Sequence, residues 1–301
     1  MRARRSSWRS RSTLLWLLAV VTSFAVGGFV GAWLGRDPAV DVAAEPYPPA
    51  EPSAVERKAA TTPPAPEPAP APEPELPRAQ GARVAVVIDD LGRSVEVVDR
   101  LADLPAPITY SVLPFEHSTD RVVRAIRRHG GQLLCHLPME PASGADPGPG
   151  ALNAAMSAGE LSRATAVALD AVAGAIGANH HMGSRMSTDE RSMKVVLGVL
   201  GERGLFYLDS RTSPDSVGYR VGRDLGVPSV ERQVFLDPDR DPEAIRGQFR
   251  RLLAIAAERG HAVAIGHPYP ETVAVLREEL PKALAAGYEF VELSALVERG
   301  V

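Results

Sequence analysis

Residues that can bind a metal or move a proton stand where short apolar segments of the sequence end. Asp89 and Asp90 close the segment VAVVIDD, and histidines or a single aspartate close four others. The whole set is Asp89, Asp90, His136, His180, His181, Asp209 and His267. Imidazole and carboxylate groups around one open position are typical ligands of a catalytic divalent metal, and Zn²⁺ there can lower the pKa of bound water to about 7. The pattern therefore indicates metal-dependent hydrolysis, in which one acid binds the ion and its neighbour accepts a proton.

The paired acids alone have a simpler explanation. Asp89 and Asp90 could merely cap a helix that begins near Ser94. The histidines at the other segment ends favour the metal site over this cap. Three further histidines lie outside the pattern and are expected at the surface or at helix ends: His117, His129 and His261. Cys135 is the only cysteine, and its apolar neighbours predict a buried strand residue, not a nucleophile.

From residue 81 onward, short apolar segments alternate with amphipathic segments of helical length. This alternation is typical of βα units around a parallel sheet, whose chemistry gathers at the carboxyl ends of the strands. Strands are predicted at residues 83–88, 108–112, 132–136, 176–180, 205–208, within 228–236, 261–266 and 288–292. About eight strands in one domain predict an α/β fold with a single distorted or incomplete (β/α) barrel over residues 81–301.

Two helix starts can be read from the sequence. Asp241 followed by Pro242 predicts a helix, because proline is favoured at the first helical position. Its predicted buried face carries Ile245, Phe249, Leu252, Leu253 and Ala256. Ser187 and Glu190, in the segment STDE, have the spacing of a capping box and predict a second start.

The first 35 residues predict a membrane anchor. Residues 1–12 carry five arginines and no acid, and residues 13–35 carry no charge. An uncharged span of ~20 residues favours an uncleaved transmembrane helix over a cleaved signal peptide, whose apolar part is ~7–15 residues. The arginines place residues 1–12 in the cytoplasm and the C-terminal domain in the periplasm, at the inner membrane. Glycines at positions 27, 31 and 35 could pair two anchors into a homodimer, although small residues are common in such spans anyway.

Residues 36–80 predict a disordered linker. They hold about half of the chain's 27 prolines, in runs such as PPAPEPAPAPEPELP, which tend toward extended polyproline II and cannot bury a core. Without the five N-terminal arginines, the formal net charge changes from −4 to −9. Nucleic acid is therefore not an expected partner of the domain.

Six pieces of the domain resemble one enzyme family. They occur in order between residues 84 and 297 and read VIDDLG, SVLP, HLPMEP, NHHMGSRMS, FYLDSRTSP and AIGHPYPETV. In these motifs the domain resembles the divergent polysaccharide deacetylases, a branch of the metal-dependent carbohydrate deacetylases. The resemblance implies a distorted (β/α) barrel, a divalent metal expected to be Zn²⁺, and an N-acetylated polysaccharide or peptidoglycan-type glycan as substrate.

The resemblance also implies roles for the principal residues. In the wider superfamily the first acid of the pair is the general base and the second binds metal, which assigns these roles to Asp89 and Asp90. His267 has the position of the general acid. His136 is the second metal ligand, and His181 is the preferred third.

The remaining candidates have open alternatives. Glu140 is the alternative third ligand, because it stands four residues after His136, where the superfamily has a histidine. Arg185 could fill the space of a superfamily arginine near the substrate. His180 should face away from the site if the strand continues, as a packing residue or a residue behind the ligands. Asp209 either orients a catalytic group or caps the next segment.

The sequence departs from the superfamily at the paired acids, because Leu91 stands between them and Gly92. The expected function is that of a membrane-anchored, periplasm-facing deacetylase. Two alternatives remain. One is a barrel without turnover that binds a glycan or a cell-wall partner as a scaffold. The other is a metal-dependent hydrolase of a different amide or ester.

Overall fold

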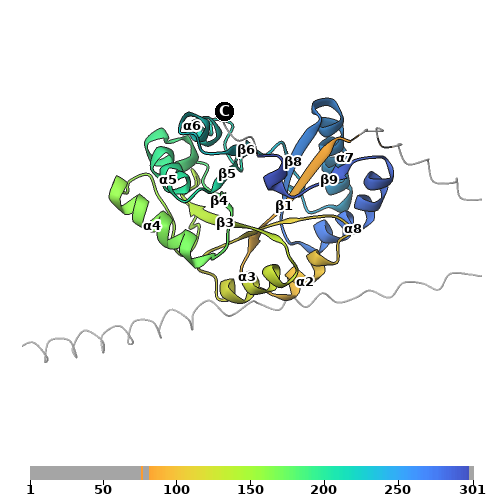
Figure 1. Ribbon diagram of the computed structural model, residues 1–301, viewed down its shortest axis with the longest axis horizontal. Coiled ribbons are helices and arrows are strands. Elements are labelled where there is room, and N and C mark those ends of the chain that lie inside the picture. Colours follow the sequence, from red (N-terminus) through yellow and green to blue (C-terminus); the bar gives the residue numbers. More distant parts are fainter. Residues whose placement is uncertain (1–75, 77–80, 298–301) are drawn as a thin grey trace, which may run out of the picture. The chain divides into compact units, whose positions relative to one another are not determined.

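The computed structural model of the chain describes Leu76 and residues 81–297 (Figure 1). The predicted cytoplasmic head, the predicted anchor with its glycines and almost all of the predicted linker lie outside these residues. None of the helices at residues 81–297 is long and apolar enough to cross a membrane. The anchor, its pairing and the linker therefore stay predictions.

Within residues 81–297, nine parallel strands form one curled sheet. They are β1 (Arg83–Leu91), β2 (Thr109–Val112), β3 (Gln132–Met139), β4 (Gly177–Met182), β5 (Phe206–Asp209), β6 (Ser229–Glu231), β7 (Val234–Phe235), β8 (His261–Gly266) and β9 (Glu289–Phe290). Their order is β6-β5-β4-β3-β2-β1-β8-β7, and β9 pairs with the start of β1. Parallel pairing brings all the carboxyl ends to one rim. The α/β class and the curled, distorted barrel agree with the prediction.

The two ends of this strand order are neighbours in the sequence. Residues 229–231 pair with β5, and residues 234–235 pair with β8. The change falls between Arg232, whose N–H donates to Asp209 O, and Gln233, whose N–H donates to Val263 O. One extended segment thus connects both edges of the sheet by changing neighbours. This is why the strand predicted within 228–236 divides into two short strands.

Helices cover the outer face of the sheet (Figure 1), and residues 81–297 contain seven of them. They are α2 (Glu96–Ala102), α3 (Thr119–Arg128), α4 (Ala158–Ala171), α5 (Glu190–Glu202), α6 (Gly218–Asp224), α7 (Pro242–Arg259) and α8 (Pro270–Ala285). Two 3₁₀ turns, Met186–Thr188 and Leu293–Ala295, complete the described elements.

Strand side chains alternate between two apolar cores. In β1, Val84, Val86 and Ile88 belong to the outer core beneath the helices. Ala85 and Val87 belong to a smaller inner core inside the curl, with Leu134, Leu208, Val263 and Ile265. Because successive strand residues point to opposite faces, a residue's position in a strand decides whether it reaches the interior of the barrel.

The predicted start of α7 is confirmed. Asp241 is its N-cap and accepts a hydrogen bond from Ala244 N at 2.9 Å, and Pro242 is the first helical residue. The predicted apolar face is buried in full. Gly260 ends the helix in the left-handed conformation (φ 81°), which glycine adopts without strain.

The predicted capping box at Ser187 and Glu190 is wrong. Ser187 lies buried in the 3₁₀ turn, and Asp189 caps α5 by accepting from Ser192 N at 2.7 Å. The extra turn moves the helix start by two residues, and within it Ser187 O accepts a hydrogen bond from Val217 N. A capping box is present instead at the start of α4, between Ser157 and Glu160.

Candidate functional site

A bulge at the end of β1 explains why two consecutive acids can face one site. Ile88 pairs with Tyr110, Leu91 pairs with Val112, and the register shifts between them. Asp90 occupies the left-handed region at φ 58°, which is strained for a residue other than glycine. The bulge adds one residue to the strand, so Asp89 and Asp90 both reach the interior and Leu91 packs in the outer core.

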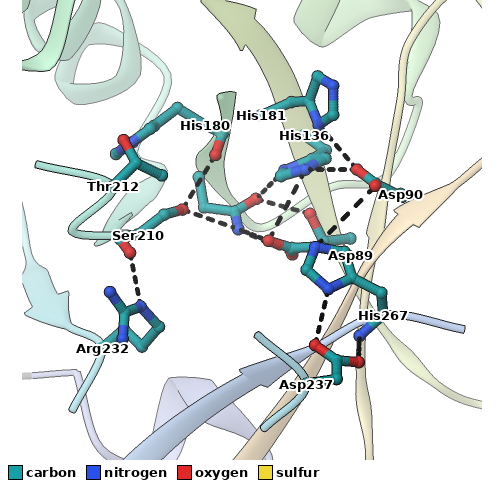
Figure 2. Close-up of polar contacts among 12 residues, drawn as sticks. Asp89, Asp90, His136, His180, His181, Ser210, Thr212, Arg232, Asp237 and His267 are labelled. Atoms are coloured by element: carbon teal, nitrogen blue, oxygen red, sulfur yellow. Dashed lines mark hydrogen bonds and ion pairs between the residues drawn. The ribbon is translucent and has the colours of Figure 1, made fainter. Parts of the chain in front are cut away.

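Asp90, His136 and His181 form a group of three potential metal ligands (Figure 2). Asp90 Oδ1 lies 3.2 Å from His136 Nε2 and 2.8 Å from His181 Nδ1. The three donor atoms all lie within 4.8 Å of one another. Two parallel neighbours, β3 and β4, supply the histidines on their inner faces. The structure thus brings together the three residues that the sequence analysis prefers as ligands.

The surroundings give the two acids different electrostatic states. Burial raises the pKa of Asp89, although nearby His136 and His267 oppose this effect. Burial also acts to raise the pKa of Asp90, but hydrogen bonds from His136 and His181 outweigh it and hold that pKa well below its usual range. Asp90 is therefore the more persistent anion, as a metal ligand must be, and Asp89 is the more basic carboxylate.

His267 faces the two acids from the end of β8. Its Nε2 lies 3.9 Å from Asp90 Oδ2, and its Nδ1 lies 2.8 Å from Asp237 Oδ1. Burial acts to lower the pKa of His267, but the hydrogen bond and the charge of Asp237 outweigh it and raise the pKa to about 9. The His267 ring also contacts two aromatic rings: its centroid lies 6.1 Å from that of Phe235 and 5.6 Å from that of Tyr269. The imidazole is thus held in place and carries a proton at neutral pH.

Asp237 is a functional candidate that does not stand out in the sequence. Its Oδ2 accepts hydrogen bonds from His267 N at 2.6 Å and Thr272 Oγ1 at 2.7 Å, so the carboxylate is fixed behind the histidine. It follows β7, which has only two residues. Two apolar residues are too few to predict where a strand ends, so the sequence does not indicate that Asp237 lies at a strand end.

Asn179 is the second missed residue. It lies in β4, two positions before His181, and is fully buried. Its side chain contacts both Asp89 and His136. The alternation of the strand could have found it, because residues 179 and 181 must point to the same face.

Glu140 and Arg185 lie away from the three potential ligands. Glu140 Oε2 accepts from Ala154 N at 2.9 Å, and its Oε1 pairs with Arg185 Nε at 3.2 Å. The Arg185 side chain is 64% exposed. In this arrangement His181, not Glu140, stands beside Asp90 and His136.

His180 and Asp209 point to the outer face of the sheet. His180 Nδ1 lies 2.9 Å from the hydroxyl of Tyr207, a residue of the outer core, as expected for a packing residue. The Asp209 carboxylate accepts from Arg211 N, Ser216 Oγ and Tyr219 N at 2.7–2.9 Å. These contacts fit the capping alternative for Asp209, because they fix the loop after β5.

The curled parallel sheet with histidine and aspartate side chains at its carboxyl rim defines a distorted (β/α) barrel with a candidate metal centre. Residues 86–297 match the family described as divergent polysaccharide deacetylase. Because this match covers more than half of the chain, the protein belongs to that family.

The chain is also similar to other proteins in sequence or in structure. A Haemophilus influenzae protein is 34% identical over 199 residues, which cover 66% of this chain and 71% of that protein. Escherichia coli YibQ is 34% identical over 196 residues, which cover 65% of this chain and 61% of YibQ, so the chain spans less than two thirds of that relative. A crystal structure of an Agrobacterium tumefaciens protein has a TM-score of 0.69 at 27% identity, covering 73% of this chain and 90% of that one.

Proposed function

We propose that the protein is a metal-dependent hydrolase that removes acetyl groups from an N-acetylated polysaccharide. The observation that carries this proposal is the group formed by Asp90, His136 and His181, with Asp89 behind it and His267 facing it. Membership of the polysaccharide deacetylase family supports the substrate class.

The donor set fits Zn²⁺. Two imidazole nitrogens and one carboxylate oxygen leave a fourth position open, as in catalytic zinc sites. Asp90 Oδ1 lies 3.2 Å from His136 Nε2 and 2.8 Å from His181 Nδ1, so the three donor atoms are close enough to bind one ion together. Asp90, His136 and His181 would hold the ion, which would polarise the acetyl carbonyl and acidify water.

Asp89 and His267 have the positions of an acid–base pair. Asp89 Oδ2 lies 3.7 Å from His136 Nε2, so this carboxylate can accept the proton of a water molecule held beside the ligands. His267 Nε2 faces the same space and can give its proton to the amine nitrogen that leaves the acetyl group. Asp237 holds the proton on His267 Nδ1 and so keeps the ring in one orientation.

The cellular setting extends this proposal. Residues 13–35 would anchor the chain in the inner membrane, and the barrel would act in the periplasm on a peptidoglycan-type glycan. A reporter fused after Val301 should be active only outside the cytoplasm. Cytoplasmic activity of the reporter would contradict the orientation.

One experiment tests the activity. The protein is purified without added metal, its metal content is measured, and acetate release is followed on N-acetylglucosamine oligomers and on peptidoglycan fragments. Bound zinc with acetate release supports the proposal, and the Asp90→Asn variant should lose both. Tight metal binding without acetate release from any acetylated glycan would contradict it and favour a glycan-binding scaffold.

A further inference from the structure

We infer that Asn179 is a positioning residue that joins the candidate base Asp89 and the candidate metal ligand His136 into one hydrogen-bonded unit. The inference rests on the proposed function for the meaning of the base, but its metal-binding part can be tested separately. Asn179 lies on the inner face of β4, and its side chain contacts residues of two other strands, Asp89 of β1 and His136 of β3.

The amide nitrogen of Asn179 holds Asp89. Nδ2 lies 2.8 Å from Asp89 Oδ1 and 3.0 Å from Oδ2, and 3.3 Å from Ser210 Oγ. Ser210 in turn donates to His180 O at 3.0 Å, so its hydroxyl hydrogen is used and its oxygen accepts from the amide. Both N–H groups of Asn179 therefore have acceptors, and the Asp89 carboxylate is fixed by both of its oxygens.

The amide oxygen of Asn179 holds His136. Oδ1 accepts from Ser111 Oγ at 2.6 Å and lies 2.9 Å from His136 Nδ1. The orientation of the amide follows from its partners, because a carboxylate can only accept and would repel Oδ1. Every donor and acceptor of this fully buried side chain is thus used, which favours a single rigid arrangement.

This arrangement selects the tautomer of His136. An imidazole that donates from Nδ1 to Asn179 leaves Nε2, the atom that faces Asp90, as the nitrogen that can give up its proton and offer its lone pair to a cation. Partners behind metal-binding histidines typically change metal affinity or activity 10–100-fold when they are removed. Asn179 therefore presents the ligand atom in the form that binds a cation.

A neutral amide also suits the base. An arginine or lysine in its place would hold Asp89 as an ion pair and would make the carboxylate a weaker proton acceptor. Asn179 fixes the position of the carboxylate without adding a charge. One side chain thus sets both the geometry of proton removal and the geometry of the ligand.

Two substitutions separate these effects. Asn179→Ala removes both contacts and should weaken Zn²⁺ binding 10–100-fold, measured by competition with a chromophoric chelator, and lower kcat at saturating Zn²⁺ by a similar factor with little change in KM. The nearly isosteric Asn179→Asp keeps an acceptor for His136 but has no amide donor for Asp89. It should retain Zn²⁺ affinity and lose kcat.

Gln132→Ala is the matched control. Gln132 lies on the same face of β3 as His136 but at the opposite end, where it bonds to Glu292 and Ser294. Its loss should lower the melting temperature and leave both Zn²⁺ affinity and kcat unchanged. ¹⁵N NMR of the Zn²⁺-bound protein should show His136 protonated at Nδ1, and this proton should exchange faster with solvent in Asn179→Ala.

The outcomes are distinct. If both Asn179 variants keep the parent's Zn²⁺ affinity and kcat, or change only in melting temperature as Gln132→Ala does, the inference is wrong. If the parent hydrolyses no acetylated glycan, the proposed function fails. The Zn²⁺ affinity of Asn179→Ala and the exchange of its His136 Nδ1 proton then still decide whether Asn179 positions the ligand.

Discussion

The two faces of β4 carry similar polar residues, but one face contributes to the candidate metal centre and the other packs in the outer core. His181 and Asn179 point into the barrel and join the candidate metal centre, whereas His180, between them, packs against Tyr207 under the helices. The same contrast separates Asp89, inside, from Asp209, outside. Residue type alone therefore does not mark a site residue, and the face of the strand on which it lies is decisive.

Asp89→Asn tests the inner face most strongly. The amide fills the same volume but cannot accept a proton, so kcat for acetate release should fall about 10² to 10⁴-fold, the usual contribution of general-base catalysis. Metal content should stay at the parent level because Asp90, His136 and His181 are intact. If this variant loses the metal while Asp90→Asn keeps it, the roles of the two acids are exchanged.

His181→Ala and His180→Ala compare adjacent residues on opposite faces. His181→Ala removes one of three ligands and should lose most of the bound metal, measured by elemental analysis after dialysis. His180→Ala should keep the metal and lower the free energy of unfolding by about 1–3 kcal/mol, because the buried hydroxyl of Tyr207 loses its partner. Metal loss in His180→Ala alone would reverse the assignment of the two faces.

Asp237→Asn tests whether Asp237 raises the pKa of His267, the candidate proton donor. Asp237 raises the pKa of His267 to about 9, so its neutralisation should lower that pKa. A general acid acts only while protonated, and activity falls as the pH rises through its pKa. The alkaline limb of the kcat profile should therefore move to lower pH in this variant. An unmoved limb would mean that His267 is not the group that titrates there.

Asp209→Asn is the outer-face counterpart, with the smallest expected effect on activity. It weakens the hydrogen bonds from Arg211 N, Ser216 Oγ and Tyr219 N, and should cost about 1–3 kcal/mol in urea unfolding. Metal content and kcat should match the parent protein. A large loss of kcat at full metal occupancy would show that Asp209 orients a catalytic group after all.

The sequence predicts the polar residues at the carboxyl rim of the barrel well, because the end of a long apolar segment marks the end of a strand. The positions of Asp89, Asp90, His136 and His181 follow from such ends, and the alternation of β4 predicts the outward direction of His180. The bulge at Asp90 was not predictable in this way, because its left-handed backbone depends on pairing with β2. Asp237 was missed for a related reason, since its strand is held by β8 and has little pattern of its own.

The segment that links β6 to β7 also has a consequence for association with other chains. A curled sheet that stops short of closure exposes backbone groups at two edges, and such edges can template strand pairing and aggregation. Here the edge strands have three and two residues. The side chain of Gln233 donates to Glu231 O at 2.8 Å and accepts from Val263 N at 2.7 Å, so it occupies backbone groups that a foreign strand would need. Gln233 therefore disfavours the addition of a foreign β-strand between β6 and β7, because the backbone groups that such a strand would bond are already used.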